Sequence, residues 1–491
     1  MGINFFNFWE QIKLLTSYSI QSPWLLTDYT FLFVLGFFLL FYAFITENIK
    51  WRNIYILAFS LFFYYKSSGL FLLVLIGIII FDFLIVKFID KQSGFKKKIY
   101  FYLALLYNLS FLFFFKYSIT LIATFNAYLG TSFNTNDWLF PIGVTFYIFQ
   151  SISYLVDVYR KEIEPVKKIT DFAFYMTFFP HIIAGPVIRA KDFLHQLSSA
   201  TIVSSSIYKE GMIRITMGLI KKLLIADSLG SYVNMIHESP VDFTGFENLI
   251  SYYAFSFQLF FDLSGYADVA IGVALLLGFR IKENFDRPYL SKNISEFWKK
   301  WHISISNWFK DYVYIPLGGS KGKLVWSYGL ILLVMLMGGI LHGIDKRFIF
   351  LGLAHGAAII IHKIWIRLVK TNSQNKIYSL IGILITFHFV SFCWIFLRAN
   401  SFSNAVKSLN KVITNTNYLD FFGFSKDHIQ LIILLIISGC IVFIPNKLKS
   451  YLNIQIMRLP TYIWLFILLI TLQVIIQFGN EIFSPFIYLQ F

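Results

Sequence analysis

Apolar stretches alternate with short polar segments along the whole chain of 491 residues. Many of these stretches approach the roughly 20 residues that an α-helix needs to cross the hydrocarbon core of a bilayer. The pattern therefore predicts an all-α polytopic membrane protein with about eleven to fourteen transmembrane, re-entrant and interfacial helices. The predicted apolar segments are residues 29–45, 54–65, 70–89, 99–115, 139–156, 172–188, 213–236, 249–261, 269–279, 324–341, 348–361, 377–396, 429–444 and 463–478.

Composition supports the same class. Hydrophobic residues make up 57% of the chain and charged residues only 14%, whereas a soluble chain averages about 25% charged residues. The net charge of +16 does not indicate nucleic-acid binding, because the basic residues form short clusters between apolar segments. Such clusters are typical of cytoplasmic loops. They lie at residues 50–52, 87–98, 160–168 and 363–376.

Two segments depart from the alternation. Residues 1–27 carry several aromatic rings and no cleavable signal pattern, which predicts an N-terminal helix on the membrane surface. Residues 280–323 are too polar to span lipid and too long for a bare connector. Their tryptophans, Trp298, Trp301 and Trp308, are rings favoured at the headgroup level, so we expect short helices at or re-entering the cytoplasmic interface.

Histidines in apolar surroundings are the first sign of chemistry. His342 follows Gly338 and Gly339 at the end of the uncharged run 324–341, and His355 lies in the next apolar segment. An imidazole can accept a proton from a hydroxyl near neutral pH, and ionisable groups beside lipid usually serve chemistry or transport. The structural alternative for His342 is a hydrogen-bonded residue at a helix end.

Several specific phrases occur along the chain, the most particular being EFWKKWHISISNWFKDYVYIPLGG at residues 296–319. The others, in chain order, are PIGVTFY at 141–147, YLVDVYR at 154–160, FPHIIAGP at 179–186, GLIKK at 218–222, FDLSGYAD at 261–268 and PFIYLQF at 485–491. Together these phrases resemble the membrane-bound O-acyltransferase (MBOAT) family, in the branch that includes the membrane subunit of bacterial alginate O-acetylation. The resemblance covers nearly the whole chain, so residues 1–491 are expected to form a single membrane domain around a central tunnel.

The resemblance implies that His342 and His302 are catalytic. A neutral imidazole that accepts the proton of an attacking hydroxyl contributes about 10²–10⁴ in rate. Asn284, in a phrase similar to the family's Asn-Phe-x-x-Pro-Tyr, and Trp301, beside His302, are further candidates for the substrate tunnel. A turn before Pro288 is the alternative explanation for the Asn284 phrase.

Asp262 and His355 are weaker candidates. A carboxylate in an apolar segment needs a partner, so Asp262 has an equally good structural role in pairing with a lysine or arginine. His355 lies seven residues before His362, two helical turns, but acyl transfer from a thioester needs no metal and the spacing fits no zinc motif. A serine-hydrolase triad that includes Ser264 is disfavoured because the Gly-x-Ser-x-Gly pattern is absent.

The resemblance implies an O-acyltransferase in the bacterial cytoplasmic membrane, without a bound cofactor. The donor is expected to be a cytoplasmic acyl thioester such as acetyl-CoA, and the acceptor a cell-envelope or secreted polysaccharide. An extracytoplasmic SGNH-like acetyltransferase is the expected partner. The alternatives are D-alanyl export for teichoic acids, a polytopic transporter, and a scaffold that only recruits the finishing enzyme.

Overall fold

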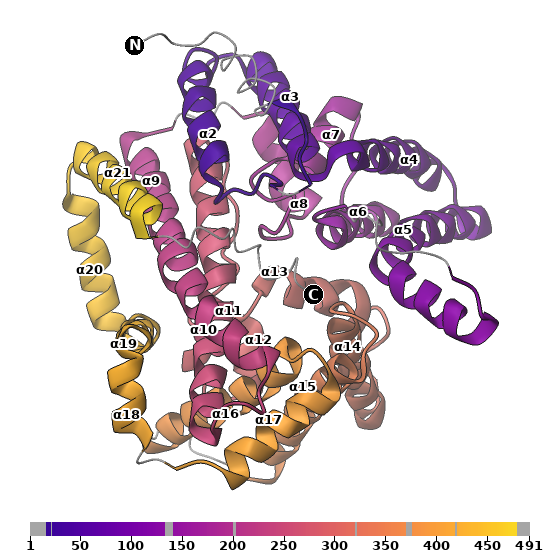
Figure 1. Ribbon diagram of the computed structural model, residues 1–491. Coiled ribbons are helices and arrows are strands. Elements are labelled where there is room, and N and C mark those ends of the chain that lie inside the picture. Colours follow the sequence, from indigo (N-terminus) through magenta and orange to yellow (C-terminus); the bar gives the residue numbers. More distant parts are fainter. Residues whose placement is uncertain are drawn as a thin grey trace. The chain divides into compact units, whose positions relative to one another are not determined.

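The computed structural model describes residues 16–20, 22–132, 141–199, 203–319, 322–369, 376–417 and 420–478. These ranges are mostly helical and contain no β-strand. The chain divides into two compact units, coloured along the sequence in Figure 1. The first unit comprises Met1–Gly211 and Val269–Lys282, and the second comprises Met212–Asp268 and Glu283–Phe491.

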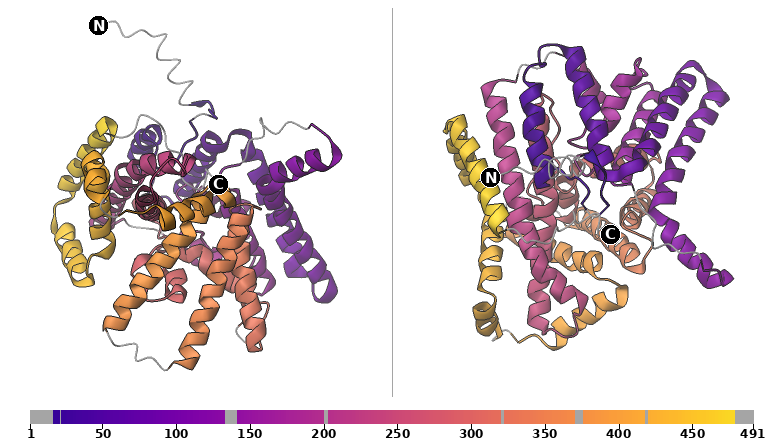
Figure 2. Two further views of the ribbon diagram at one scale, coloured as in Figure 1. Left: turned by 60° about the horizontal axis from the view of Figure 1, so that its bottom comes forward. Right: turned by 45° about the horizontal axis from the view of Figure 1, so that its top comes forward.

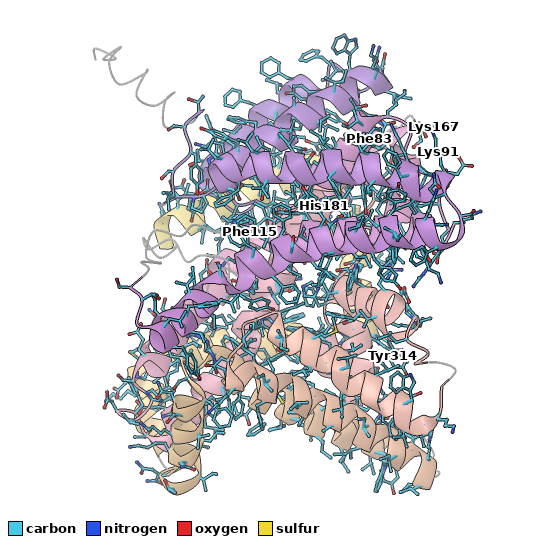
Figure 3. All side chains as sticks on the ribbon, turned by 90° about the vertical axis from the view of Figure 1, so that its right-hand side faces the viewer. Phe83, Lys91, Phe115, Lys167, His181 and Tyr314 are labelled. Carbon is cyan, nitrogen blue, oxygen red and sulfur yellow. The ribbon has the colours of Figure 1, made fainter. Side chains whose placement is uncertain are left out.

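The first unit contains the helices of the N-terminal part of the chain. They are α2 (Tyr29–Tyr42), α3 (Ile49–Ser68), η1 (Gly69–Phe71), α4 (Leu72–Lys91), α5 (Gly94–Leu129), α6 (Val144–Tyr159), α7 (Ile169–Thr177), α8 (Ala190–Phe193) and η2 (Leu194–Leu197). The side chains of Asp28 and Asn48 cap α2 and α3 by accepting backbone N–H bonds from Phe31 and Trp51. α4 and α5 run antiparallel, with Lys91 beside the turn that joins them (Figure 3).

His181 lies in the turn after α7, in the interior of the first unit (Figure 3). Its Nδ1 is 2.7 Å from the carbonyl oxygen of Phe178, and its Nε2 is 3.0 Å from the amide nitrogen of Gln150. Nδ1 therefore donates and Nε2 accepts, which describes a neutral ring. Burial lowers the pKa of His181 to about 3. Both ring nitrogens of His181 therefore form hydrogen bonds that hold the turn in place.

Two long helical stretches cross the boundary between the units in sequence. The first begins as α9 (Ser205–Leu219), passes through the π-helix η3 (Ile220–Ala226) and continues as α10 (Asp227–Glu238). The second is α11 (Gly245–Leu276), whose last residues belong to the first unit. α11 is apolar enough to span a membrane and yet is buried inside the protein, so it is shielded from lipid.

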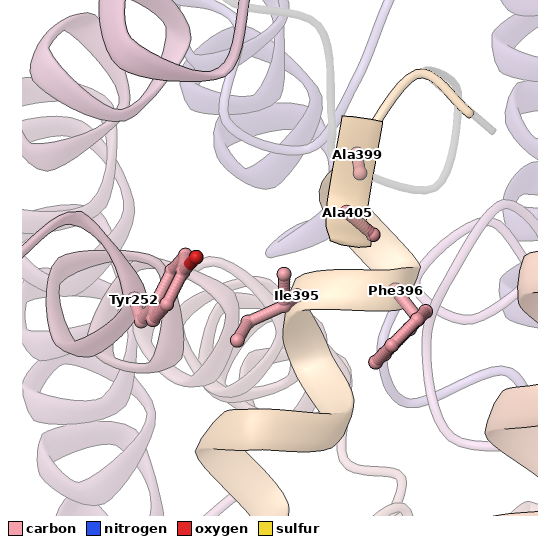
Figure 4. Close-up of a cluster of buried hydrophobic side chains, with 5 residues drawn as sticks. All are labelled: Tyr252, Ile395, Phe396, Ala399 and Ala405. Carbon is pink, nitrogen blue, oxygen red and sulfur yellow. The ribbon is translucent and has the colours of Figure 1, made fainter. Parts of the chain in front are cut away.

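The second unit continues with η4 (Pro288–Leu290), α12 (Ile294–Lys300), α13 (Ile303–Phe309), η5 (Lys310–Tyr314), α14 (Leu324–Ile340), α15 (Lys346–Leu368), α16 (Lys376–Arg398), α17 (Phe402–Thr414), α18 (Asp420–Asp427), α19 (Ile429–Phe443), α20 (Asn446–Arg458) and α21 (Thr461–Phe478). α14, α15 and α16 lie side by side (Figure 2, left). Where α16 meets α17 and α11, Ile395 faces Tyr252 in a cluster of buried side chains (Figure 4).

The helices confirm a multi-pass membrane protein. Among the described residues, five helical stretches are long and apolar enough to span a bilayer, and the α19–α20 pair, bent by 94°, adds a sixth if it counts as one span. Shorter apolar helices are α2, α14 and most of α21. Large apolar side chains such as Phe44 and Leu70 are exposed, as expected of a surface that faces lipid.

Several predicted boundaries are wrong. Segments 249–261 and 269–279 form one helix, α11, because the polar residues between them are paired inside the protein. Segment 172–188 is helical only to Thr177, since Pro180 lacks an N–H and restricts Phe179 before it. α17 and α20 escaped prediction because they are too polar to form an apolar segment. The predicted helix at 1–27 falls largely outside the described residues, and residues 22–27 are not helical.

Candidate active site

His302 occupies a sharp turn between α12 and α13. Its backbone is left-handed, with φ at 45°, and it stands at the N-terminal cap of α13. Among the described non-glycine residues, only Lys161, Arg287 and His302 have positive φ. Such a conformation is strained for a bulky side chain and often marks functional sites. Two of these three residues lie in the polar region 280–323, which does contain short helices.

Asn284 holds this turn through three contacts. Its carbonyl oxygen accepts the N–H of Ile303 at 2.8 Å, and its Oδ1 accepts the N–H of Ser304 at 3.0 Å. Its Nδ2 lies 3.2 Å from Nδ1 of His302. Because Oδ1 is committed to a backbone N–H, the group facing the ring is the amide nitrogen, which only donates. With this orientation of the amide, we assign Nδ1 as the acceptor and the ring proton to Nε2.

The His302 side chain is neutral as well as oriented. The residue is 5% exposed, and burial lowers its pKa to about 3, against a smaller opposing effect of its own backbone carbonyl. The ring of Phe285 contacts it at 5.7 Å between centroids. At neutral pH the imidazole thus carries a donor at Nε2 and no charge, a state suited to polarising a carbonyl oxygen.

A cluster of aromatic side chains packs against Trp301, the residue that precedes His302 in the turn. Trp301 is 3% exposed, stacks on Phe297 at 5.5 Å and contacts Trp394 at 5.3 Å. Trp394 donates a 3.3 Å hydrogen bond to the hydroxyl of Tyr289, which donates to the carbonyl of Ser256. Trp301, proposed from the sequence as a tunnel residue, therefore packs in the cluster that fixes the backbone beside His302. Trp394 was missed because its apolar segment gives no sign of a polar role.

His355 lies against the same cluster. Its ring contacts Trp394 at 5.6 Å and Trp298 at 5.2 Å. It is 1% exposed, and within the described part of the chain neither of its ring nitrogens has a hydrogen-bond partner. Buried polar atoms normally find partners, so this position calls for an explanation.

His342 lies two residues after the end of α14, in the turn that leads to α15. Its backbone N–H donates to Gly339 at 2.9 Å, and its half-buried ring contacts Phe348 of α15 at 5.9 Å. A side chain at Gly343, where φ is 147°, would meet the Phe348 ring. A side chain at Gly339 would strike the backbone of α15, so this glycine allows the two helices to touch. Together the glycines shape the turn that presents His342.

Asp262 has a structural partner. Its carboxylate accepts a 2.7 Å bond from Lys222, and Lys222 also donates to Asp227 at 2.7 Å. Lys222 lies on the π-helix and is fully buried. The structure therefore brings Asn284 to His302 and links Trp301 to His355 through Trp394, while it engages Asp262 in an ion pair, as the structural alternative expected.

Comparison with known proteins identifies the family of this chain. The sequence profile of the membrane-bound O-acyltransferase family matches residues 161–402, which include Asn284, His302 and His342. The chain is 35% identical over 381 residues to the probable alginate O-acetylase AlgI of Pseudomonas aeruginosa, covering 76% of this chain and 71% of that protein. The chain belongs to the membrane-bound O-acyltransferase family. It is an O-acyltransferase, and the resemblance drawn from its motifs is confirmed.

Other relatives of this chain transfer acetyl or D-alanyl groups. The peptidoglycan O-acetyltransferase of Helicobacter pylori is 30% identical, covering 77% of this chain and 76% of that protein. The teichoic acid D-alanyltransferase of Bacillus subtilis is 29% identical, covering 51% of this chain and 67% of that protein. Similarity to the acetylating relatives thus extends over more of this O-acyltransferase than similarity to the D-alanylating one.

Proposed function

We propose that this O-acyltransferase takes an acetyl group from a cytoplasmic thioester, acetyl-CoA, and passes it across the bacterial cytoplasmic membrane for O-acetylation of a cell-envelope or secreted polysaccharide. The longer similarity to the alginate and peptidoglycan acetylating proteins supports acetyl over D-alanyl. The basic clusters that the positive-inside rule assigns to the cytoplasm suit an anionic donor.

In the proposed chemistry His342 is the general base. The acceptor hydroxyl oxygen attacks the thioester carbonyl carbon while the imidazole of His342 takes its proton. The tetrahedral intermediate then collapses, the carbon–sulfur bond breaks, and the proton passes from His342 to the leaving thiolate. In this proposal the transfer requires no metal and no bound cofactor.

His302 then stabilises the negative charge of the intermediate. The observation that carries this role is the contact with Asn284, which leaves the proton of a neutral ring on Nε2. A donor aimed at a developing oxyanion is worth about 10²–10³ in rate. The two histidines thus have different tasks, one as base and the other as hydrogen-bond donor.

Completion of the reaction is assigned to a second protein. The hydroxyl acetylated by the membrane enzyme then belongs to an intermediate acceptor and not to the polysaccharide. Its acetyl ester would be presented on the outer face, where an SGNH-like acetyltransferase breaks that ester and transfers the acetyl group to a hydroxyl of the polysaccharide. A gene for such a protein beside this one would support acetylation, and a gene for a small acyl-carrier protein would support D-alanylation.

The test is the ester content of the envelope polymers, measured by mass spectrometry. His342→Ala is expected to abolish O-acetyl esters while the membrane abundance of the protein stays normal. The matched control is His195→Ala, an exposed histidine in the first unit, which should leave acetylation unchanged. Loss of D-alanyl esters instead would favour the teichoic acid alternative, and unchanged acetylation in His342→Ala would refute the assignment.

A further inference from the structure

α20 (Asn446–Arg458) turns away from the helix that precedes it. α19 is apolar, and the two helices are bent by 94° at a break that contains Pro445. A helix at a right angle to one that crosses the bilayer runs along the plane of the membrane. All side chains of α20 are exposed except those of Gln455 and Ile456, which are half-buried. Within the described residues, α20 therefore has little protein packed against it.

The side chains of α20 form an apolar face with a basic residue on each side. Leu448, Tyr451 and Leu452 are exposed and share one face of the helix, because they lie three and four residues apart. Lys447 and Lys449 are the neighbours of Leu448 in sequence, so each lies about 100° around the helix from it. The sequence of α20 contains no acidic residue. Such a pattern is typical of a helix in the headgroup layer, where apolar side chains enter the membrane and lysines reach the phosphates.

Arg287 binds the bend between α19 and α20. Its guanidinium donates a hydrogen bond to the carbonyl oxygen of Ile444, the residue that follows α19. The backbone of Arg287 is left-handed, with φ at 49°, a conformation that costs free energy in a residue with a bulky side chain. The loop therefore holds a guanidinium at the bend in spite of this strain.

Carboxylates do not balance the positive charge at the bend. Lys449 lies close enough to Arg287, Lys221 and Arg214 for their charges to act on it. Lys221 and Arg214 are both paired with a carboxylate. In the part of the chain that the structure describes, Arg287 and Lys449 form no ion pair, and Asp286 offsets only part of their charge. Two such cations suit a phosphate group, which offers several acceptor oxygens.

The bend lies beside the polar region 280–323. The short helix η4, which begins directly after Arg287, packs against α19. Region 280–323 is expected at the cytoplasmic interface, where anionic phospholipids give the membrane surface a negative potential. Phospholipid headgroups are therefore the anions expected at this depth.

We propose that α20 lies in the cytoplasmic headgroup layer and that Arg287 and Lys449 bind the phosphate of an anionic phospholipid at the α19–α20 bend. The acyl chains of the lipid would cover the apolar face of α20. Lipid binding at the bend is independent of which acyl group the enzyme transfers. Because Arg287 lies three residues after Asn284, the bound lipid would also steady the loop that carries Asn284.

Lipid binding to the full-length protein in detergent tests the charged site. Phosphatidylglycerol and phosphatidylcholine are titrated separately, and native mass spectrometry gives the Kd of each. Wild type should bind phosphatidylglycerol about tenfold more tightly, since each nearby cation adds to the affinity for an anionic lipid. The double variant Lys447→Gln, Lys449→Gln should raise that Kd about tenfold, and Arg287→Gln should raise it as well. The matched control, Lys447→Arg, Lys449→Arg, keeps both charges and should not raise Kd.

Hydrogen exchange tests whether the lipid lies at α20. The amides of α20 should exchange more slowly in nanodiscs of an equal mixture of the two lipids than in nanodiscs of phosphatidylcholine alone. The double glutamine variant should remove this difference.

Four results would overturn the proposal. They are equal Kd values of wild type for the two lipids, an unchanged Kd in the double glutamine variant, equal exchange of α20 in both kinds of nanodisc, and protection of α20 that requires two copies of the protein in one nanodisc. Displacement of the lipid by inorganic phosphate would assign the cations to a soluble anion and would also contradict a lipid site.

Discussion

At the scale of single residues, hydrogen-bond partners decide what each histidine can do. His181 uses both ring nitrogens to hold a turn, whereas Asn284 leaves Nε2 of His302 as a donor. Neither difference is visible in the sequence, where both residues are histidines within family motifs. The partner residue, lying eighteen positions earlier in the case of His302, sets the tautomer.

Asn284→Asp tests this assignment without changing the shape of the side chain. An aspartate accepts from Ser304 as before, but its second oxygen also accepts, so the His302 proton moves to Nδ1 and Nε2 loses its donor. We expect kcat to fall about 100-fold, within the range for loss of one oxyanion donor. Acetyl transfer in membrane vesicles measures it. A rate equal to wild type, with normal protein abundance, would contradict the assigned tautomer.

At the scale of elements, glycines set the contact between α14 and α15. A side chain at Gly352 would meet the backbone of Met335 and Leu336, and one at Gly339 would meet Phe348 and Gly352. The helices therefore touch backbone to backbone, as small residues allow in membranes. This contact holds the end of α14, two residues before His342, against α15.

Gly352→Val and Gly338→Ala form a matched pair of tests. Valine at position 352 overlaps the backbone of α14 and should destabilise the protein by about 1–3 kcal/mol, with reduced acetyl transfer. At Gly338 a side chain meets nothing within 4 Å, so alanine should be neutral or stabilising by up to about 1 kcal/mol. Thermal unfolding in detergent compares them. Equal midpoints would show that α14 and α15 tolerate separation.

At the scale of the whole molecule, each compact unit contains a buried neutral histidine, His181 in the first and His302 in the second. Burial lowers the pKa of both to about 3. Unfolding returns each ring to an ordinary pKa near 6.5, so the unfolded chain binds more protons below that pH. Their contribution to stability is present above about pH 6.5 and is lost as pH falls toward about 3.

Mildly acidic pH should therefore lower the free energy of unfolding of the protein. At pH 5 each histidine lowers the free energy of unfolding by about 2 kcal/mol relative to neutral pH, at about 1.4 kcal/mol per pKa unit. We expect a lower thermal midpoint at pH 5 than at pH 7.5. His181→Gln should reduce this pH dependence, whereas the exposed His195→Ala should not. A midpoint that does not change between the two pH values would show that these rings are accessible to protons.

The sequence by itself determined the broad class of this protein. The apolar segments determined that the chain is helical and crosses a membrane, because hydrocarbon requires every backbone polar group to be satisfied within a helix. The motifs identified the family and the two histidines of interest. The predicted segment boundaries were wrong where a polar residue is paired with a residue distant in sequence. Asp262 of α11, for example, pairs with Lys222 of η3, and such pairing makes a carboxylate tolerable inside a buried helix.

Only the tertiary structure decided which polar atoms are satisfied. It showed that Asn284 contacts His302, that Trp301 packs beneath the His302 turn, and that Trp394 belongs to the same cluster. Hydrogen bonds and ring contacts are short-ranged, so they depend on which helices become neighbours and on their rotation, and neither is written in a single apolar segment. The sequence thus determined that this protein is embedded in a membrane and that it transfers acyl groups, and packing decided which role each histidine has.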